Sequence, residues 1–326
     1  MVEASAPAKV ILFGEHFVVY DEPAIVLAID KRAHTRATLR RDNRIYIRSD
    51  DLKASGFFEG GRFQTEKGGK EAETKLQPIR TVIQKILAKS DKNIGVNVEI
   101  ESLIPVAVGL GSSAAVAASV AAAVGQLLDV ELSSKEIFQL AYEAERLVHG
   151  TPSGIDPAVA TYGGALVYRK NEGFEPLQVE ADIPLVIGNT GMQRSTGKLV
   201  ALVRRRRNRY PTIIEPIIKA GGEITQKAVE ALKRGDFATL GELMNINQAL
   251  LSAVGVSNEA LERLIHAAMN AGAFGAKLTG GGGGGCMVAL ASRGKLRQIA
   301  EAIEKAGGTA FTARKTDEGV RIEQKT

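Results

Sequence analysis

Residues 105–115 have the composition of a loop that binds a phosphate group. Gly109 and Gly111 carry no Cβ, so the backbone can turn tightly there and approach a ligand closely. Ser112 or Ser113 is suited to cap a helix that the following alanine-rich run predicts as far as Leu128. The free N–H groups and positive dipole end of a helix start favour an anion. The predicted phosphate loop consists of Pro105, Val106, Ala107, Val108, Gly109, Leu110, Gly111, Ser112, Ser113, Ala114 and Ala115.

Two common phosphate-binding patterns do not account for this loop. A Walker loop needs Gly-Lys-Ser/Thr, and no lysine follows Gly111. The spacing Gly109-x-Gly111-x-x-Ala114 matches the dinucleotide fingerprint, which requires a second strand after the helix. The chain instead continues into another helix, which begins with the capping box Ser133-x-x-Glu136. The remaining alternative to a phosphate site is a plain glycine turn before a buried helix.

Charged residues and a second glycine run fall at the ends of predicted elements, where functional groups tend to gather. Lys9 begins an apolar run that ends at Gly14-Glu15-His16, and Glu145 lies near the end of a helix. Asp156 stands between Gly154 and Pro157, and six glycines occupy 280–285. Alone, each has an ordinary explanation: a snorkelling lysine, a solvated helix glutamate, an aspartate that forms a turn. Together with the loop they supply a phosphate cradle, oxygen ligands for Mg²⁺, a lysine and a proton acceptor, which phosphoryl transfer requires.

Composition and charge restrict the class of protein. The chain has 326 residues, enough for two domains, and 44% of them are hydrophobic, as in ordinary globular proteins. The net charge of +5 is a mild excess, and the run Arg204–Arg207 lacks the interleaved aromatics of a nucleic-acid site. A single cysteine, Cys286, excludes an intramolecular disulfide. We expect a cytoplasmic protein with neither a signal peptide nor a membrane span, and a homodimer is left open.

Hydrophobic periodicity predicts an α+β fold in both halves. In the first half we expect strands over 9–13, 24–29, 35–39, 44–48, 95–101 and 162–168, an extended run at 17–20, helices over 76–88, 112–128 and 133–148, and a loop or mobile hairpin over 49–75. In the second half we expect a strand at 185–187, helices over 196–208, 212–234, 236–252, 257–271 and 295–306, a strand at 286–290 and two short closing strands. Pro216 and Gly221-Gly222 are expected to interrupt the second of these helices. We place the domain boundary within 170–182, giving domains 1–175 and 176–326.

Three separated motifs resemble those of the galactokinase, homoserine kinase, mevalonate kinase and phosphomevalonate kinase (GHMP) superfamily, in the same order. They are Lys9-Val-Ile-Leu-Phe-Gly-Glu-His-Phe-Val-Val-Tyr20, Pro105-x-x-x-Gly-Leu-Gly-Ser-Ser-Ala-Ala115 and Lys277-Leu-Thr followed by the six glycines and Cys286. Within the superfamily, Gly14-Glu15-His16-x-Val-Val, Glu145-Arg-x-x-His149-Gly-x-Pro-Ser-Gly-x-Asp156 and Asn189-Thr190-Gly191-x-x-Arg194-Ser195-Thr196 are most similar to the mevalonate kinase family.

The resemblance implies a fold and an activity. The fold has two domains, an N-terminal one like ribosomal protein S5 and a C-terminal ferredoxin-like one, with the active site in the cleft between them. The implied reaction is the ATP- and Mg²⁺-dependent phosphorylation of the 5-hydroxyl of mevalonate, in isoprenoid precursor synthesis. No nucleic acid or membrane takes part.

The resemblance also implies roles for individual residues. Asp156 matches the catalytic base, and Lys9 matches the lysine that stabilises the developing alkoxide. Ser113 (or Ser112) and Glu145 match the Mg²⁺ ligands, and residues 105–115 match the ATP-binding loop. The residues that match the substrate pocket are Glu15, His16, Arg194, Thr196, Gly280 and Gly281.

Some departures and alternatives stay open. Phe17, Asp21 and Glu22 differ from the usual mevalonate kinase pattern, which we expect to reshape the mouth of the pocket. Gly281 replaces a frequent alanine, which we expect to add mobility and to remove no chemistry. Another GHMP enzyme, such as phosphomevalonate kinase or a mevalonate 3-kinase or decarboxylase relative, remains an alternative, as does a non-catalytic ligand-binding relative. Galactokinase is disfavoured because Phe17-Val18 follow Glu-His, and homoserine kinase because it lacks an aspartate at position 156.

Overall fold

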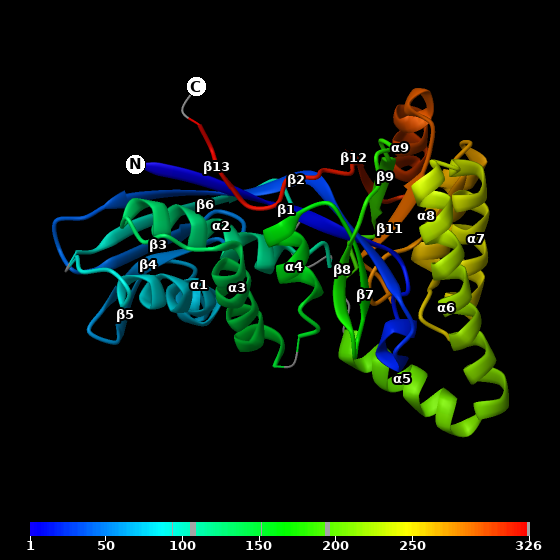
Figure 1. Ribbon diagram of the computed structural model, residues 1–326, viewed down its shortest axis with the longest axis horizontal. Coiled ribbons are helices and arrows are strands. Elements are labelled where there is room, and N and C mark those ends of the chain that lie inside the picture. Colours follow the sequence, from blue (N-terminus) through cyan, green and yellow to red (C-terminus); the bar gives the residue numbers. More distant parts are fainter. Residues whose placement is uncertain (93, 105–108, 151, 193–195, 325–326) are drawn as a thin grey trace.

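The computed structural model describes residues 1–92, 94–104, 109–150, 152–192 and 196–324. These residues form two sheets placed side by side, each with its own helices (Figure 1). The larger sheet has the order β13-β1-β2-β6-β3-β4-β5, and β7 joins it by pairing with both β2 and β8. Its strands are β1 (Val2–Phe13), β2 (Ala24–Leu39), β3 (Ile45–Ser49), β4 (Ala54–Glu59), β5 (Arg62–Lys67), β6 (Val96–Ser102), β7 (Ala165–Arg169), β8 (Gly173–Leu177) and β13 (Arg321–Ile322).

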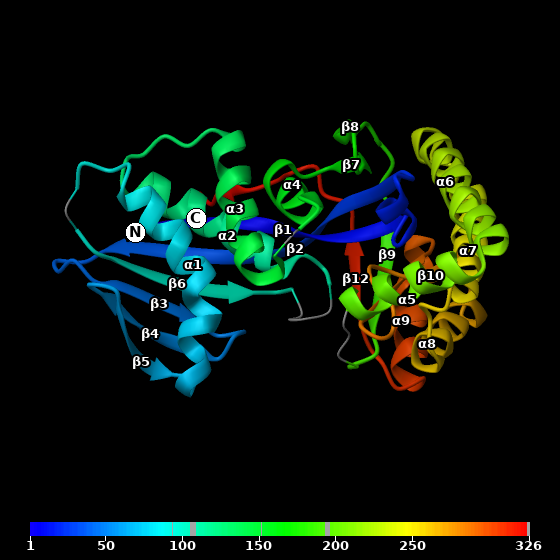
Figure 2. The same cartoon turned by 90° about the horizontal axis from the view of Figure 1, so that it is seen from below.

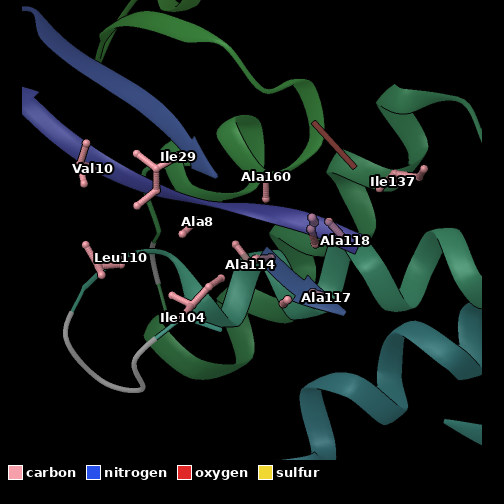
Figure 3. Packing of buried hydrophobic residues seen from close by; sticks show 14 of the residues in the cluster. Ala8, Val10, Ile29, Ile104, Leu110, Ala114, Ala117, Ala118, Ile137 and Ala160 are labelled. Atoms are coloured by element: carbon pink, nitrogen blue, oxygen red, sulfur yellow. The ribbon is translucent and has the colours of Figure 1, made fainter. Parts of the chain in front are cut away.

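Helices cover one face of the larger sheet (Figure 1). They are α1 (Ala72–Leu87), α2 (Ser112–Leu127), α3 (Ser134–His149) and α4 (Ile155–Tyr162). The small apolar side chains of α2 are buried almost all round, so this helix fits between β1, β2 and the neighbouring helices. Figure 3 shows Ile104 and Leu110 beside Ala114, under Ala8 of β1. The core thus holds the start of α2 directly below β1.

The smaller sheet has the order β10-β11-β9-β12, with every pair antiparallel. Its strands are β9 (Pro184–Asn189), β10 (Gly275–Leu278), β11 (Cys286–Leu290) and β12 (Thr309–Arg314), and its helices are α5 (Thr196–Arg209), α6 (Pro211–Arg234), α7 (Phe237–Ala253), α8 (Glu259–Asn270) and α9 (Leu296–Lys305). Along the chain this is a strand, helices, two strands, a helix and a strand. That succession with this strand order is ferredoxin-like, which confirms the expected topology.

Two connections tie the sheets together. β1 and β2 extend as a two-stranded arm towards α6 (Figure 2). At the end of the arm the ring of Phe17 packs on Gly221, where a Cβ would come within 2.1 Å of the ring. After β12 the chain returns to the larger sheet, where β13 pairs with β1 at Ala4 and Ser5. Gly221 and Gly222 therefore leave room for side chains that pack on α6. The helix continues without a break through these glycines and through Pro216.

The structure adds local elements that the sequence did not define. Phe17–Tyr20 forms one turn of 3-10 helix, η1, because Asp21 adopts a left-handed conformation and closes it. The segment 49–75, expected as a loop or mobile hairpin, contains the hairpin β4–β5 followed by the turn η2 (Gly69–Glu71). The exposed side chains of β5 and η2 hide the strand pattern there. Helix α4, which carries Asp156, was not expected at all. Within the described residues, no helix has both the length and the apolar character needed to cross a bilayer.

Candidate active site

Lys9 of β1 and Asp156 of α4 form an ion pair at the centre of the candidate site. The Lys9 ammonium and the Asp156 carboxylate lie 3.1 Å apart; the lysine side chain is 7% exposed and the aspartate side chain 30% exposed. Burial of the aliphatic stem aims the ammonium at one place, while the carboxylate remains open on one side. The pair therefore places a fixed cation beside an accessible proton acceptor.

The start of α2 reaches this pair through Gly111. Its backbone is left-handed (φ +76°), and a Cβ there would lie 2.9 Å from Cγ of Lys9 and 3.8 Å from Cβ of Asp156. The carbonyl of Leu110 accepts a hydrogen bond from the Lys9 amide at 2.8 Å. Gly111 itself is the N-cap residue, so the expected serine cap was wrong: Ser112 and Ser113 are the first two residues of the helix. The N–H groups at a helix start are not paired within the helix, which leaves them available to an anion.

Two tyrosines hold the segment that leads into α4. The hydroxyl of Tyr168 on β7 donates to the carbonyl of Ser153 at 3.2 Å, and that of Tyr142 on α3 donates to Pro152 at 3.4 Å. Burial raises the pKa of Tyr168, which keeps its hydroxyl protonated and able to donate. Gly154, with φ +86°, then turns the chain into α4 against the Tyr142 ring. These contacts fix the backbone two to four residues before Asp156.

The glycine run is a tightly built turn between β10 and β11. Five of the six glycines, all but Gly281, have a positive φ, which residues other than glycine rarely adopt. The backbone amide of Gly283 donates to the carbonyl of Val256 at 2.8 Å, and that of Gly285 donates to the carbonyl of Met192 at 3.1 Å. A Cβ on Gly281 would lie 2.7 Å from Oγ1 of Thr196, so the residue has a steric role.

The turn after β1 docks onto the glycine run. The ring Nε2 of His16 lies 2.9 Å from the carbonyl oxygen of Gly281. Oγ1 of Thr279 accepts from the Ile11 amide at 3.0 Å and donates to the Ile11 carbonyl at 2.9 Å. Glu15 is buried and pairs with Lys277 of β10. Thus His16, Thr196 and Gly281 of the predicted substrate pocket are brought together, with Gly280 in the same turn.

The proposed metal ligands lie on two helices. Glu145 is buried in α3, and Ser113 is exposed in the first turn of α2. Both supply oxygen, the donor that Mg²⁺ prefers, and a magnesium site with two protein ligands completes its shell with water and phosphate. No group of three or more His, Cys, Asp or Glu suited to a metal occurs in the described part of the chain. The donor chemistry is therefore compatible with Mg²⁺ shared between protein and nucleotide.

Sequence reasoning did not identify every residue of the site. Thr279, Asn247, Tyr142 and Tyr168 received no role, since their contacts are with residues far away in the chain. Lys277 was quoted only as part of a motif, although a lysine in the apolar run Ala276–Leu278 is itself a signal. The predicted site residues that lie outside the described ranges are Pro105, Val106, Ala107, Val108 and Arg194.

Two family models match the chain. The model of the GHMP kinases N terminal domain covers residues 78–164, which include the phosphate loop, Glu145 and Asp156. The model of the GHMP kinases C terminal domain covers residues 228–309, which include the glycine run.

Curated proteins and solved structures resemble the whole chain. The mevalonate kinase of Pyrococcus abyssi is 49% identical over 333 aligned positions, which cover 99% of this chain and 98% of that protein. The crystal structure of L. major mevalonate kinase in complex with R-mevalonate superposes with a TM-score of 0.86, at 29% identity, over 98% of this chain and 97% of that one. The crystal structure of the Methanococcus jannaschii mevalonate kinase gives a TM-score of 0.81 at 27% identity, over 96% and 98% of the two chains.

Proposed function

The chain belongs to the GHMP kinases, and within them to the mevalonate kinases; from this membership and from the site we infer that it transfers a phosphoryl group from ATP to the 5-hydroxyl of (R)-mevalonate, giving 5-phosphomevalonate for isoprenoid synthesis. The observation that carries this inference is the Lys9–Asp156 pair at the start of α2. The pair supplies a proton acceptor and a fixed positive charge, and the start of α2 beside it supplies a helix terminus suited to phosphate.

Asp156 acts as the general base. Its carboxylate accepts the proton of the 5-hydroxyl while the hydroxyl oxygen forms a bond to the γ-phosphorus. The bond between that phosphorus and the β–γ bridging oxygen breaks, and ADP leaves with the electron pair. Lys9 stabilises the negative charge that develops on the attacking oxygen, because its ammonium is held 3.1 Å from the same carboxylate.

Residues 109–115, with Pro105–Val108 before them, cradle the ATP phosphates. The helix start supplies N–H donors, and Gly111 keeps the phosphates close to Lys9, since a side chain there would stand between them. Ser113 and Glu145 would hold Mg²⁺, which neutralises phosphate charge when it is bound.

The substrate lies between the turn after β1 and the glycine run. His16, Thr196, Gly280 and Gly281 form the wall on this side, and Glu15 supports it from behind. Arg194 supplies a cation for the substrate carboxylate. A cytoplasmic location remains a prediction from the sequence, and a homodimer remains an open alternative.

An ADP-release assay with mevalonate, phosphomevalonate, homoserine and galactose tests the substrate. We expect turnover of mevalonate to exceed that of the other three acceptors by orders of magnitude. Equal or faster turnover of phosphomevalonate would favour the alternative GHMP kinase, and ATP binding without turnover of any acceptor would favour a non-catalytic relative.

A further inference from the structure

Two buried opposite charges lie behind the predicted substrate wall and take no part in the transfer step described above. The side chains of Glu15 and Lys277 are both 0% exposed and form an ion pair through Oε1. Lys277 also donates to the carbonyl of Leu278 at 2.6 Å. The second carboxylate oxygen, Oε2 of Glu15, accepts from the amide of Asn247 on α7 at 3.2 Å. Each of the two charged groups thus has two hydrogen-bonding partners inside the protein.

Such a pair is costly to bury and contributes little to stability, because desolvation offsets the attraction between the charges. Burial lowers the pKa of Lys277, and the adjacent Glu15 carboxylate partly opposes that shift. Two apolar residues of similar volume would fill this space at no greater cost. The pair is therefore better explained by the arrangement that it imposes than by the stability that it adds.

The pair joins the two segments that form the substrate wall. Glu15 belongs to the turn after β1, while Lys277 lies on β10 directly before the glycine run. On either side of the pair, His16 contacts Gly281 and Thr279 contacts Ile11. Ile11 is two residues after Lys9 on the same strand, so the position of β10 against this strand also sets where the glycine run lies relative to Lys9.

We propose that the Glu15–Lys277 pair is a positioning device for phosphoryl transfer: it locks the glycine run against β1, so that His16 and Gly281 hold the substrate in line with Lys9 and Asp156. This proposal rests on the proposed function. Neither residue touches the reacting atoms, so both are positioning residues. Glu15, predicted from the resemblance to be in the substrate pocket, acts through His16 in this arrangement.

Removing one member of the pair should give a distinctive pH signature. Lys277 approaches Glu15 from β10, and Asn247 approaches it from α7, whose acidic residue Glu242 is exposed instead. His16, the other titratable side chain of the turn, contacts Gly281. Removing either member of the pair leaves a single buried charge, and desolvation drives that charge towards its neutral form.

The test compares Glu15→Gln, Lys277→Met and the double variant, using kcat/KM for mevalonate as a function of pH. In Lys277→Met the Glu15 carboxylate stays buried without its cation, and because an unpaired buried anion is costly, activity should fall as the pH rises. In Glu15→Gln the isolated Lys277 has a lowered pKa, so activity rises with pH. We expect each single variant to lose about 10- to 100-fold at its unfavourable pH. In the double variant neither charge remains, so we expect neither the loss of activity at high pH nor the loss at low pH. Its activity should exceed that of the worse single variant.

The outcomes separate this proposal from the proposed function. If the wild-type protein phosphorylates no mevalonate, the proposed function fails, and the same opposite pH trends in the thermal midpoints of the variants still test the lock. If the wild type is active and both single variants keep its pH profile and KM, the lock is wrong. Should a single variant fail to fold by circular dichroism, the double variant decides: a raised KM for mevalonate supports the lock, and a wild-type KM overturns it.

Discussion

The ammonium of Lys9 and the carboxylate of Asp156 lie 3.1 Å apart although they stand on β1 and α4, which are far apart in the chain. Only Gly111 separates this pair from the start of α2, since a Cβ at that position would touch both side chains. The Asp156 carboxylate, the Lys9 ammonium and the helix start proposed to bind phosphate are therefore held close together by direct contact.

Kinetics of Asp156→Asn, Lys9→Met and the double variant test this coupling. Removal of a positioned base costs roughly 10²- to 10⁴-fold in kcat, and we expect Asp156→Asn to fall in that range with the KM for ATP almost unchanged. Lys9→Met should also act mainly on kcat. If both groups act on one hydroxyl, as proposed, the double variant should be little worse than the poorer single variant. Additive losses, or a Lys9 effect confined to KM, would show that the two side chains act separately.

Gly111→Ala tests the close approach of α2. The added Cβ meets Lys9 at 2.9 Å, so the ammonium must move, and we expect kcat to fall by more than about tenfold. Gly61→Ala is the matched control, because Gly61 has a similar φ of +84° with no atom within 4 Å of its Cβ position. Both variants carry backbone strain of about 1 kcal/mol, and only the first should lose activity. Equal kinetic effects would mean that backbone strain, and not contact with Lys9, is responsible.

Gly281→Ala tests the steric role of the glycine run. Its Cβ would lie 2.7 Å from Oγ1 of Thr196, so we expect Thr196 to shift and the KM for mevalonate to rise about three- to tenfold. The KM for ATP should stay near its original value. Combining Gly281→Ala with Thr196→Ala removes the two nearest atoms and leaves Cβ of residue 196 at 3.2 Å, so the double variant should lie close to Thr196→Ala alone. A Gly281→Ala variant with wild-type KM would show that Thr196 adapts freely.

Tyr168→Phe tests the support of α4. The variant loses one hydrogen bond to Ser153, worth about 0.5–1.5 kcal/mol, while the ring stays in place. If that contact fixes Asp156, kcat should fall about three- to tenfold. Tyr162→Phe is the control, since its ring belongs to the neighbouring cluster with Phe138 and Phe174. A loss of thermal stability without a change in kcat would make Tyr168 purely structural.

The capping box of α3 predicts how stability depends on pH. Hydrogen bonds from Lys89 and from Ser133 lower the pKa of Glu136 to about 2. A lowered folded-state pKa adds stability above the unfolded value of about 4.3, and that contribution is lost as the pH falls towards 2. Urea unfolding should therefore show a stability difference between wild type and Glu136→Gln at pH 7 that shrinks by pH 2.5. Glu131→Gln, at an exposed acid before the helix, should show little difference at either pH, and a constant Glu136 effect would contradict the assignment.

The parts of the site that the sequence predicted are those with a local signature. Gly109, Gly111 and the run 280–285 were recognisable because glycine permits conformations that other residues avoid. The Ser133–Glu136 capping box was correct because its two partners are three residues apart. Helices α2, α3 and α7 were placed to within a few residues because hydrophobic periodicity is also a local signal.

What the sequence could not supply were contacts between distant segments. Nothing near Glu15 indicates that its partner is Lys277, and nothing near Tyr168 points to Ser153. The glycines of α6 looked like breaks because their role depends on Phe17, which packs on them from another element. Propensity describes one segment at a time, so tertiary contacts of this kind are outside its reach.

The pairing of β13 with β1 has a consequence for synthesis on the ribosome. Residues 3–5 leave the ribosome well before their partners at 321–323, which are added more than three hundred residues later. Until then this edge of β1 offers unpaired N–H and C=O groups to any other strand, including one from a neighbouring nascent chain. Contacts of such long range also form slowly. The nascent chain therefore has to keep β1 from pairing wrongly while more than three hundred residues are added.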